Sequence, residues 1–473
     1  MQEQPRFPRE SWFPLAAGLL WLWWGVAGGI APFLLSLLPG VLLVASGGAQ
    51  LLWPGDPRIP HHAALGGVLG VLLGLPAIFV LGLGPALVLM ALSAASFVAA
   101  GSFAVRLEVP TENVPPAHPS LGLAAQVAAD EALLATMGIS MPTLGTDETR
   151  AIGREVEAAR ELFQDRGWLE KPDRYHAQPF PLDAPRIRDR SVRVRGGRFP
   201  FEHLSFESEY EPHRDEPGRE RWLDYAPNRT AHAWVLRHAD RAESRPWLVC
   251  VHGYQMGSPL IDLAAFDPRY FHQKLGLNLL LPVLPLHGPR KVGRRSGDGF
   301  LAGNALDTVH AEAQAMWDIR RLLSWIRLQG GSEIGVHGLS LGGYNCALLA
   351  CFDEGLRCAI PGVPATDLAR LYWRHGPSPQ IRFMEHHGMV CDEFAELLTV
   401  VSPLALEPAV PHQHRAIFGG VADRVVPPDQ VRDLWEHWGQ PEVVWYQGAH
   451  MTFALAPSVR ELVDTTLRTA LAF

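Results

Sequence analysis

Charged residues are absent from two long stretches near the beginning of the chain. Residues 11–53 contain no Asp, Glu, Lys or Arg, and residues 59–105 contain none either. Each stretch exceeds the roughly 20 residues that an apolar helix needs to cross a bilayer. A cleaved signal peptide fits poorly, because the first run is too long and a second run follows it. Runs of this length are rare in soluble cores, so the sequence predicts a transmembrane region at residues 1–110.

Each apolar run is long enough for two short spans, because helix-breaking residues lie near its middle. Gly-Gly-Ile-Ala-Pro at 28–32 interrupts the first run, and Gly-Leu-Gly-Pro at 82–85 interrupts the second. Two long tilted helices and a three-helix arrangement are the alternatives. Arg6 and Arg9 mildly favour the cytoplasm for the amino terminus and, with an even number of spans, for the rest of the chain. We predict four helices in two hairpins, at about 12–29, 32–53, 64–82 and 85–105.

Cysteine is scarce, and no metal-binding pattern accompanies it. The five cysteines include no CxxC pair and no Cys/His ligand spacing, which predicts buried, reduced thiols and fits a reducing compartment. His386 and His387 lack partners at metal-ligand spacing. No glycine-rich loop has the strand–helix setting that cradles a phosphate. We therefore expect neither a metal nor a cofactor.

Basic residues are too few for a general nucleic-acid-binding protein. The formal net charge is −8, and residues 1–110 contain four basic and four acidic residues, so the acidic excess lies in residues 111–473. An acidic soluble part is a poor electrostatic partner for nucleic acid. The expected partners are instead membrane lipids, through the apolar front of the chain.

The pattern changes twice after the apolar region. Residues 111–190 begin with a Pro-rich linker and continue with two helical patterns, which predict a support segment. In residues 191–473 short apolar runs alternate with helical patterns, which predicts an α/β domain with a doubly wound, mostly parallel sheet. Residues 366–402 are rich in aromatic and methionine side chains and too long for a turn. We predict that they form a helical cap insertion; a surface excursion with a small satellite core is the alternative.

The sequence Gly-Leu-Ser-Leu-Gly at 338–342 is the strongest catalytic signal. An apolar strand-like run precedes Ser340 and a helix-like run follows it. This strand–turn–helix setting is that of a nucleophile elbow, in which a sharp, strained turn exposes the serine. Side chains at Gly338 and Gly342 would collide with neighbouring backbone in such a turn.

A serine nucleophile needs a base within hydrogen-bond reach, and the base needs an acid that orients it. In this setting the chain order is serine, acid, histidine. Asp423 and His450 each follow an apolar strand-like run, in that order after Ser340. We predict that Ser340, Asp423 and His450 form a catalytic triad; Asp367 is the alternative acid.

Acyl transfer also needs hydrogen-bond donors for the oxyanion. One predicted donor is the backbone N–H of Leu341, directly after the nucleophile. The other lies in the loop after residues 247–251, where we predict the N–H of Tyr254, with Gln255 as the alternative. Further candidate substrate-binding residues are His252, Gln255, Arg290 and Lys291. His252 has a competing structural role, in which its ring holds the loop from below, and a solvated loop is the competing interpretation of residues 290–295.

Residues 195–473 resemble the α/β-hydrolase superfamily through His252-Gly253, Gly338 to Gly343, Asp423 and His450. The sequences 251–259 and 284–290 look like the abhydrolase-domain-18-type branch. This resemblance implies the α/β-hydrolase fold and a serine hydrolase for which lipid-like esters are suspected substrates. The apolar front lies outside the resemblance.

Three functional hypotheses follow. The first is a membrane-anchored serine hydrolase that cleaves carboxylic esters, possibly lipid-like ones, through an acyl-enzyme. The second keeps the fold but cleaves peptides or amides, although no propeller-type repeats support it. The third is a membrane protein that binds a ligand or partner without catalysis, and the complete set Ser340, Asp423 and His450 weighs against it.

Overall fold

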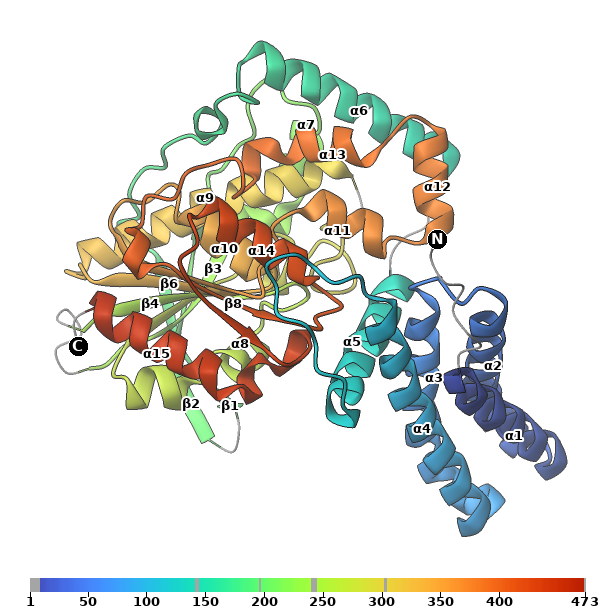
Figure 1. Ribbon diagram of the computed structural model, residues 1–473. Coiled ribbons are helices and arrows are strands. Elements are labelled where there is room, and N and C mark those ends of the chain that lie inside the picture. Colours follow the sequence, from blue (N-terminus) through green and yellow to red (C-terminus); the bar gives the residue numbers. More distant parts are fainter. Residues whose placement is uncertain (1–8, 141–143, 195–196, 240–244, 302–303, 472–473) are drawn as a thin grey trace. The chain divides into compact units, whose positions relative to one another are not determined.

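The computed structural model describes residues 9–140, 144–194, 197–239, 245–301 and 304–471 (Figure 1). The chain divides into two compact units. Unit 1 comprises Met1–Met141, Gly419–Asp429 and Trp445–Pro457, and unit 2 comprises Pro142–Phe418, Gln430–Val444 and Ser458–Phe473.

Unit 1 begins with four apolar helices, which pack as pairs (Figure 1). Gly29 has φ 95° and Gly82 has φ 85°, backbone conformations that favour glycine, and each forms the turn inside one pair. Small residues allow close helix contact: a Cβ on Gly18 would lie 2.6 Å from the backbone nitrogen of Val44. The helices are α1 (Trp12–Gly28), α2 (Ile30–Leu52), α3 (Ile59–Leu81) and α4 (Leu83–Leu107).

Three of these helices, α2, α3 and α4, are long and apolar enough to cross a membrane. Helix α1 has 17 residues and is about 26 Å long, slightly less than the roughly 30 Å of a hydrocarbon core. Large apolar side chains point outward from the helices, with Ile30 82% exposed and Phe79 90% exposed. Such surfaces are suited to contact with lipid.

Helix α5 (Leu121–Ser140), which the sequence analysis placed in the support segment, packs against α3 and α4. A Cβ on Gly101 of α4 would lie 1.9 Å from the carbonyl oxygen of Ala124, so the two helices approach very closely. The same unit contains the returning segments 419–429 and 445–457. One apolar core of unit 1 therefore combines residues from α4, α5 and these two segments: Ala104, Leu123, Val127, Val421, Ala422 and Ala449.

The sheet has nine strands in the order β1-β2-β3-β5-β4-β6-β7-β8-β9. Strands β1, β2, β3 and β5 pair antiparallel, and β5, β4, β6, β7 and β8 pair parallel. Strands β4, β5 and β6 are buried along their whole length, as their predominantly apolar sequences favour. The strands are β1 (Arg186–Val194), β2 (Gly197–Glu207), β3 (Thr230–Leu236), β4 (Trp247–Val251), β5 (Asn278–Pro282), β6 (Ile334–Leu339), β7 (Leu356–Gly362), β8 (Ala416–Gly420) and β9 (Glu442–Tyr446).

Helices cover both faces of the sheet in unit 2. Helices α9 (Ala305–Leu328) and α10 (Leu341–Leu349) lie on one face, and α8 (Pro259–Ala265) and α15 (Pro457–Leu471) lie on the other (Figure 1). Together with the strand order and the strand–turn–helix at Ser340, this arrangement confirms the predicted α/β-hydrolase fold. The remaining helices outside the cap are α6 (Thr146–Asp165), α7 (Arg219–Asp224) and α14 (Pro428–His437).

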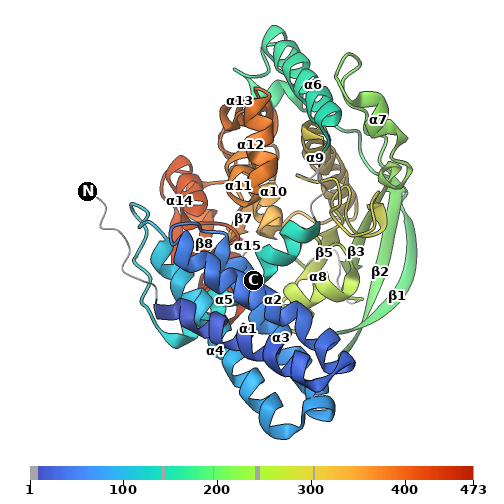
Figure 2. The same ribbon diagram turned by 90° about the vertical axis from the view of Figure 1, so that its right-hand side faces the viewer.

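The insertion between β7 and β8 is helical, as predicted. It contains α11 (Leu368–His375), α12 (Ser378–His386) and α13 (Cys391–Leu398). Helix α13 packs against α6 (Figure 2). The side chain of Arg160 in α6 donates to Glu396 of α13. The insertion has its own buried apolar side chains, which form a small satellite core, and its role as a cap stays a prediction: Tyr372, Ile381, Met384, Phe394 and Leu397.

Candidate active site

Ser340 lies at the turn between β6 and α10 with a strained backbone, φ 59° and ψ −117°. Two glycines make the turn possible. A Cβ on Gly338 would lie 1.9 Å from the carbonyl oxygen of Gly342, and a Cβ on Gly342 would lie 1.9 Å from that of Val251. Only hydrogen fits at these positions, so the local sequence enforces the sharp turn that a nucleophile elbow requires.

Hydrogen bonds hold the elbow on both sides. The Ser340 N–H donates to the Gly362 carbonyl at 2.9 Å, and the Ser340 carbonyl accepts from Tyr344 at 3.1 Å and Ala365 at 3.3 Å. The next residue, Leu341, is the first residue of α10, where backbone N–H groups have no partner inside the helix. The Leu341 N–H is therefore available to an oxyanion, and the helix dipole favours negative charge there.

The loop after β4 runs beside the serine. A Cβ on Gly253 would lie 3.5 Å from the Ser340 Cβ and 3.2 Å from the Leu339 carbonyl oxygen. Tyr254 and Gln255 follow directly, and Gln255 has φ 63°, in the left-handed region. This loop thus contributes its backbone to the surroundings of Ser340, on the side where the second oxyanion donor was predicted.

His252 has a structural role in this loop, which corrects its candidacy for substrate binding. The ring is fully buried, its Nδ1 donates to the Gly253 carbonyl at 2.8 Å, and its Nε2 accepts from the Leu284 N–H at 3.1 Å. Burial lowers the pKa of His252 to about 4, so the ring stays neutral and keeps this donor–acceptor pattern at neutral pH. Both ring nitrogens are used to hold the loop, as the competing structural interpretation predicted.

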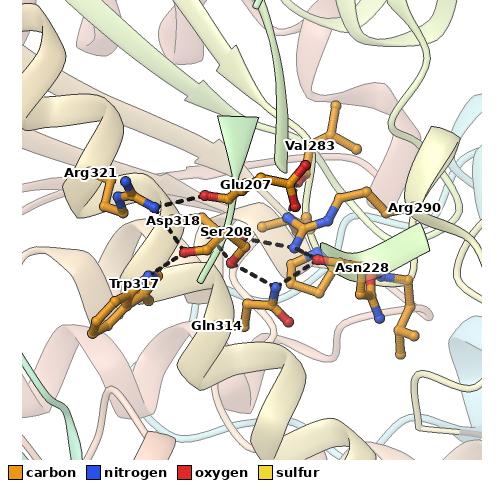
Figure 3. A network of polar contacts seen from close by, with 12 residues as sticks. Glu207, Ser208, Asn228, Val283, Arg290, Gln314, Trp317, Asp318 and Arg321 are labelled. Carbon is orange, nitrogen blue, oxygen red and sulfur yellow. Dashed lines mark hydrogen bonds and ion pairs between the residues drawn. The ribbon is translucent and has the colours of Figure 1, made fainter. Parts of the chain in front are cut away.

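Arg290 also turns inward, which argues against its predicted contact with substrate (Figure 3). Its side chain is 1% exposed and forms an ion pair with Asp318 at 2.8 Å. It donates to the carbonyl groups of Val283 at 3.0 Å and Asn228 at 3.1 Å. Sequence could not distinguish Arg290 from Lys291, which is exposed and donates to the Arg294 carbonyl at 3.1 Å.

Asp423 and His450 meet in unit 1. The His450 Nδ1 lies 2.7 Å from Asp423 Oδ2, while Asp423 Oδ1 accepts from the N–H groups of Val425 at 3.0 Å and Val426 at 2.8 Å. Both side chains are buried. If Nδ1 donates to the carboxylate, Nε2 is the basic nitrogen, which is the tautomer that a general base needs.

Electrostatics favour the protonated form of His450. Burial alone lowers the pKa of His450, but the negative charge of Asp423 and its hydrogen bond outweigh burial, and the buried carboxyl of Asp130 on α5 adds to them. The net effect raises the pKa of His450 above its usual value. A histidine with a raised pKa holds a transferred proton well, which is a property that general acid–base catalysis uses.

Asp367, the alternative acid, has another role. Its Oδ1 accepts from the Arg370 N–H at 2.9 Å, and it is the N-cap of α11.

Among the described residues, no group of three or more His, Cys, Asp or Glu side chains could hold a metal ion. The predicted catalytic residues are divided between the two units. Unit 1 contains the Asp423–His450 pair, and unit 2 contains Ser340, Leu341, Tyr254 and Gln255.

Sequence reasoning missed Asp130. This residue is fully buried, and its Oδ2 accepts from the backbone N–H of His450 at 2.8 Å. The available signal was the pair Asp130-Glu131 in the middle of an otherwise apolar helical pattern. Such a pair needs compensating partners when the helix is buried.

No protein-family model matches the chain, so the finer resemblance to the abhydrolase-domain-18-type branch stays a prediction. Similar solved structures include acetyl xylan esterase 1 from Thermoanaerobacterium sp. JW/SL YS485, 12% identical with a TM-score of 0.45 over 64% of this chain and 93% of that chain. The acetyl xylan esterase from Paenibacillus sp. R4 is 16% identical, with a TM-score of 0.45 over 64% of this chain and 99% of that chain.

Two sequence relatives come from strains of Mycobacterium tuberculosis. Uncharacterized protein MT2702 of strain CDC 1551 / Oshkosh is 45% identical over 358 residues, which cover 75% of this chain and 84% of the relative. Uncharacterized protein Rv2627c of strain ATCC 25618 / H37Rv matches with the same identity and the same coverage. At this identity and coverage, the chain belongs to the same protein family as these two mycobacterial proteins.

Proposed function

We propose that the protein is a membrane-bound serine hydrolase that cleaves carboxylic esters. The observation that carries this proposal is the backbone of Ser340, strained at φ 59° in a turn where Gly338 and Gly342 admit no side chain. Such strain persists only where the surrounding structure enforces it, and it is concentrated at functional sites. A second support is the buried Asp423–His450 pair, whose hydrogen bond at 2.7 Å gives the histidine the orientation of a general base.

In the proposed mechanism His450 Nε2 takes the proton from Ser340 Oγ while the oxygen attacks the ester carbonyl. The N–H groups of Leu341 and Tyr254 stabilise the tetrahedral oxyanion, and His450 then gives the proton to the leaving alcohol. Water, activated by the same histidine, attacks the acyl-enzyme and releases the acid. Asp423 orients the imidazole and stabilises its charged form. The chain order serine, acid, histidine supports this assignment, as does the position of each residue in the loop or turn that follows a strand.

The apolar helices support a choice of substrate class. Helices α2, α3 and α4 are each able to cross a bilayer by length and composition, so the enzyme would meet esters that partition into membranes. We therefore propose amphipathic, lipid-like esters as substrates. The five free cysteines fit a catalytic domain in a reducing compartment, and we propose the cytoplasmic side.

A fluorophosphonate probe tests this function directly in the full-length protein. We expect the probe to label the wild type and to fail on Ser340→Ala. Ser332→Ala is the matched control, because Ser332 is an exposed serine at the other end of β6 and should not affect labelling. Equal labelling of the wild type and Ser340→Ala, or no labelling at all, contradicts the proposal.

Substrate class needs a separate experiment. Lipid extracts of membranes incubated with wild type or Ser340→Ala should differ in a defined set of esters. Esters of p-nitrophenol with increasing chain length, compared with aminoacyl amides, separate an esterase from the alternative peptidase or amidase. Faster cleavage of the amides would favour that alternative.

A further inference from the structure

Helix α5 contains two adjacent acidic residues that are both fully buried in unit 1, Asp130 and Glu131. Burying a carboxylate is costly unless charges or hydrogen-bond donors compensate it. The compensating groups therefore show what these residues hold in place. For both residues these groups belong largely to the segments that contain Asp423 and His450.

One oxygen of Asp130 connects the two segments. Asp130 Oδ2 accepts from the backbone N–H of His450 at 2.8 Å and from the backbone N–H of Arg424 at 3.1 Å. His450 is the proposed base, and Arg424 directly follows the proposed acid. The carboxylate thus fixes the backbone of the acid segment and the backbone of the base segment to the same point on α5.

Glu131 holds the acid segment through a side chain. It accepts from Arg424 Nε at 2.7 Å, and Arg424 also forms an ion pair with Glu108 at the end of α4. His61, near the start of α3, contacts Glu131 as well. The Arg424 side chain is 3% exposed, so this pairing is little screened by solvent.

We propose that Asp130 is a positioning residue for the Asp423–His450 pair, and that α5 is therefore part of the catalytic machinery rather than a support segment. This inference rests on the proposed function, because the pair matters for catalysis only if His450 acts as the base. A misplacement of about 1 Å in a catalytic group costs roughly 10²-fold in rate. One acceptor shared by both segments opposes such displacement.

The test compares variants of Asp130 in the full-length protein. Asp130→Asn keeps a side-chain oxygen at the same distance from the backbone, so it can still accept hydrogen bonds from both N–H groups. This variant should label with the fluorophosphonate at nearly the wild-type rate. Asp130→Leu has similar volume but no acceptor, and labelling should slow by about 10²-fold. Ser93→Ala is the control for general destabilisation, because it removes a buried hydrogen bond to Trp21 in the same unit without touching either segment.

Two readouts separate positioning from simple instability. Melting temperatures identify variants that unfold, and hydrogen exchange of the peptide 445–457 reports whether the His450 segment is held. If Asp130→Leu does not fold, Asp130→Ser replaces it. The serine side chain is too short for its hydroxyl to accept hydrogen bonds from both N–H groups. A folded Asp130→Leu or Asp130→Ser protein that labels at the wild-type rate overturns the inference, as does an Asp130→Asn protein as slow as Asp130→Leu.

Failure of the proposed function gives a different result. In that case the probe does not label the wild type, and the exchange measurement alone tests the role of Asp130. Faster exchange in Asp130→Leu than in Asp130→Asn and Ser93→Ala supports positioning of the segment, and equal exchange in all three overturns it.

Discussion

Replacing Arg290 by methionine distinguishes a structural role from contact with substrate. The guanidinium is 1% exposed and holds Asp318 at 2.8 Å together with two backbone carbonyls. Methionine fills much of the same space but leaves the Asp318 carboxylate without its nearest counter-charge. Removing one partner of a buried ion pair costs about 3–5 kcal/mol. In a domain of this size we expect the melting temperature to fall by on the order of 10 °C.

The protonation of Asp318 makes this loss depend on pH. Burial raises the pKa of Asp318, and the positive charge of Arg290 only partly offsets this effect. Without Arg290 the pKa should rise further. A carboxyl group with a raised pKa in the folded state loses its contribution to stability as pH increases, since the unfolded chain releases the proton more easily. The fall in melting temperature should therefore be larger at pH 8 than at pH 5.

Melting followed by tryptophan fluorescence in detergent measures both effects. Asp318→Leu in the same chain as Arg290→Met should recover part of the lost stability, because it removes the unpaired charge. Lys291→Met is the matched control, since Lys291 is exposed and its replacement should change stability by less than about 0.5 kcal/mol. The reasoning is refuted if Arg290→Met melts like the wild type but raises KM, because Arg290 would then contact substrate.

Two further predictions concern His450 and the apolar helices. Because the pKa of His450 is raised, kcat/KM should fall with decreasing pH at a midpoint above the usual histidine value. Burial and the neighbouring Asp423 raise the pKa of Asp130 to about 7, so Asp130 is partly charged near neutral pH, and Asp130→Asn should move the midpoint lower by removing that charge. The charged groups that raise the pKa of His450 are Asp423 and Asp130. Tyr446 interacts with the same two carboxyl groups, and burial keeps the pKa of Tyr446 well above its usual value, so this group stays neutral throughout. A chain that begins after residue 141 should be insoluble or inactive when expressed alone, as sedimentation and fluorophosphonate labelling would show; a soluble, fully labelled fragment contradicts this expectation.

Local sequence signals predicted the parts of the molecule that depend on nearby residues. The elbow at Ser340 follows from glycines two residues away on each side, and β4 follows from a continuous apolar run. Helix α3 begins at Ile59, five residues before its predicted start. Its second residue is Pro60, which fits the first turn of a helix and does not end it.

Contacts between distant parts of the chain could not be predicted in the same way. Asp130 accepts hydrogen bonds from residues 294 and 320 positions away, and no periodic pattern links them. Arg290 is followed in the sequence by other basic residues, which are exposed. The composition of this segment therefore predicted a loop that faces solvent or substrate. The inward position of Arg290 depends on Asp318 of α9, which supplies the buried counter-charge.

The composition of unit 1 bears on what the apolar helices do. In an enzyme with a detachable anchor, the acid and base segments would have a core of their own. Here Val421, Ala422 and Ala449 of these segments are buried with Ala104 of α4 and Val127 of α5. Removing these helices would expose that apolar surface and leave the N–H of His450 without Asp130. The folding of the apolar helices and the geometry of the acid–base pair are therefore coupled, so changes in the packing of α4 or α5 should alter catalysis even where no residue of the proposed triad is changed.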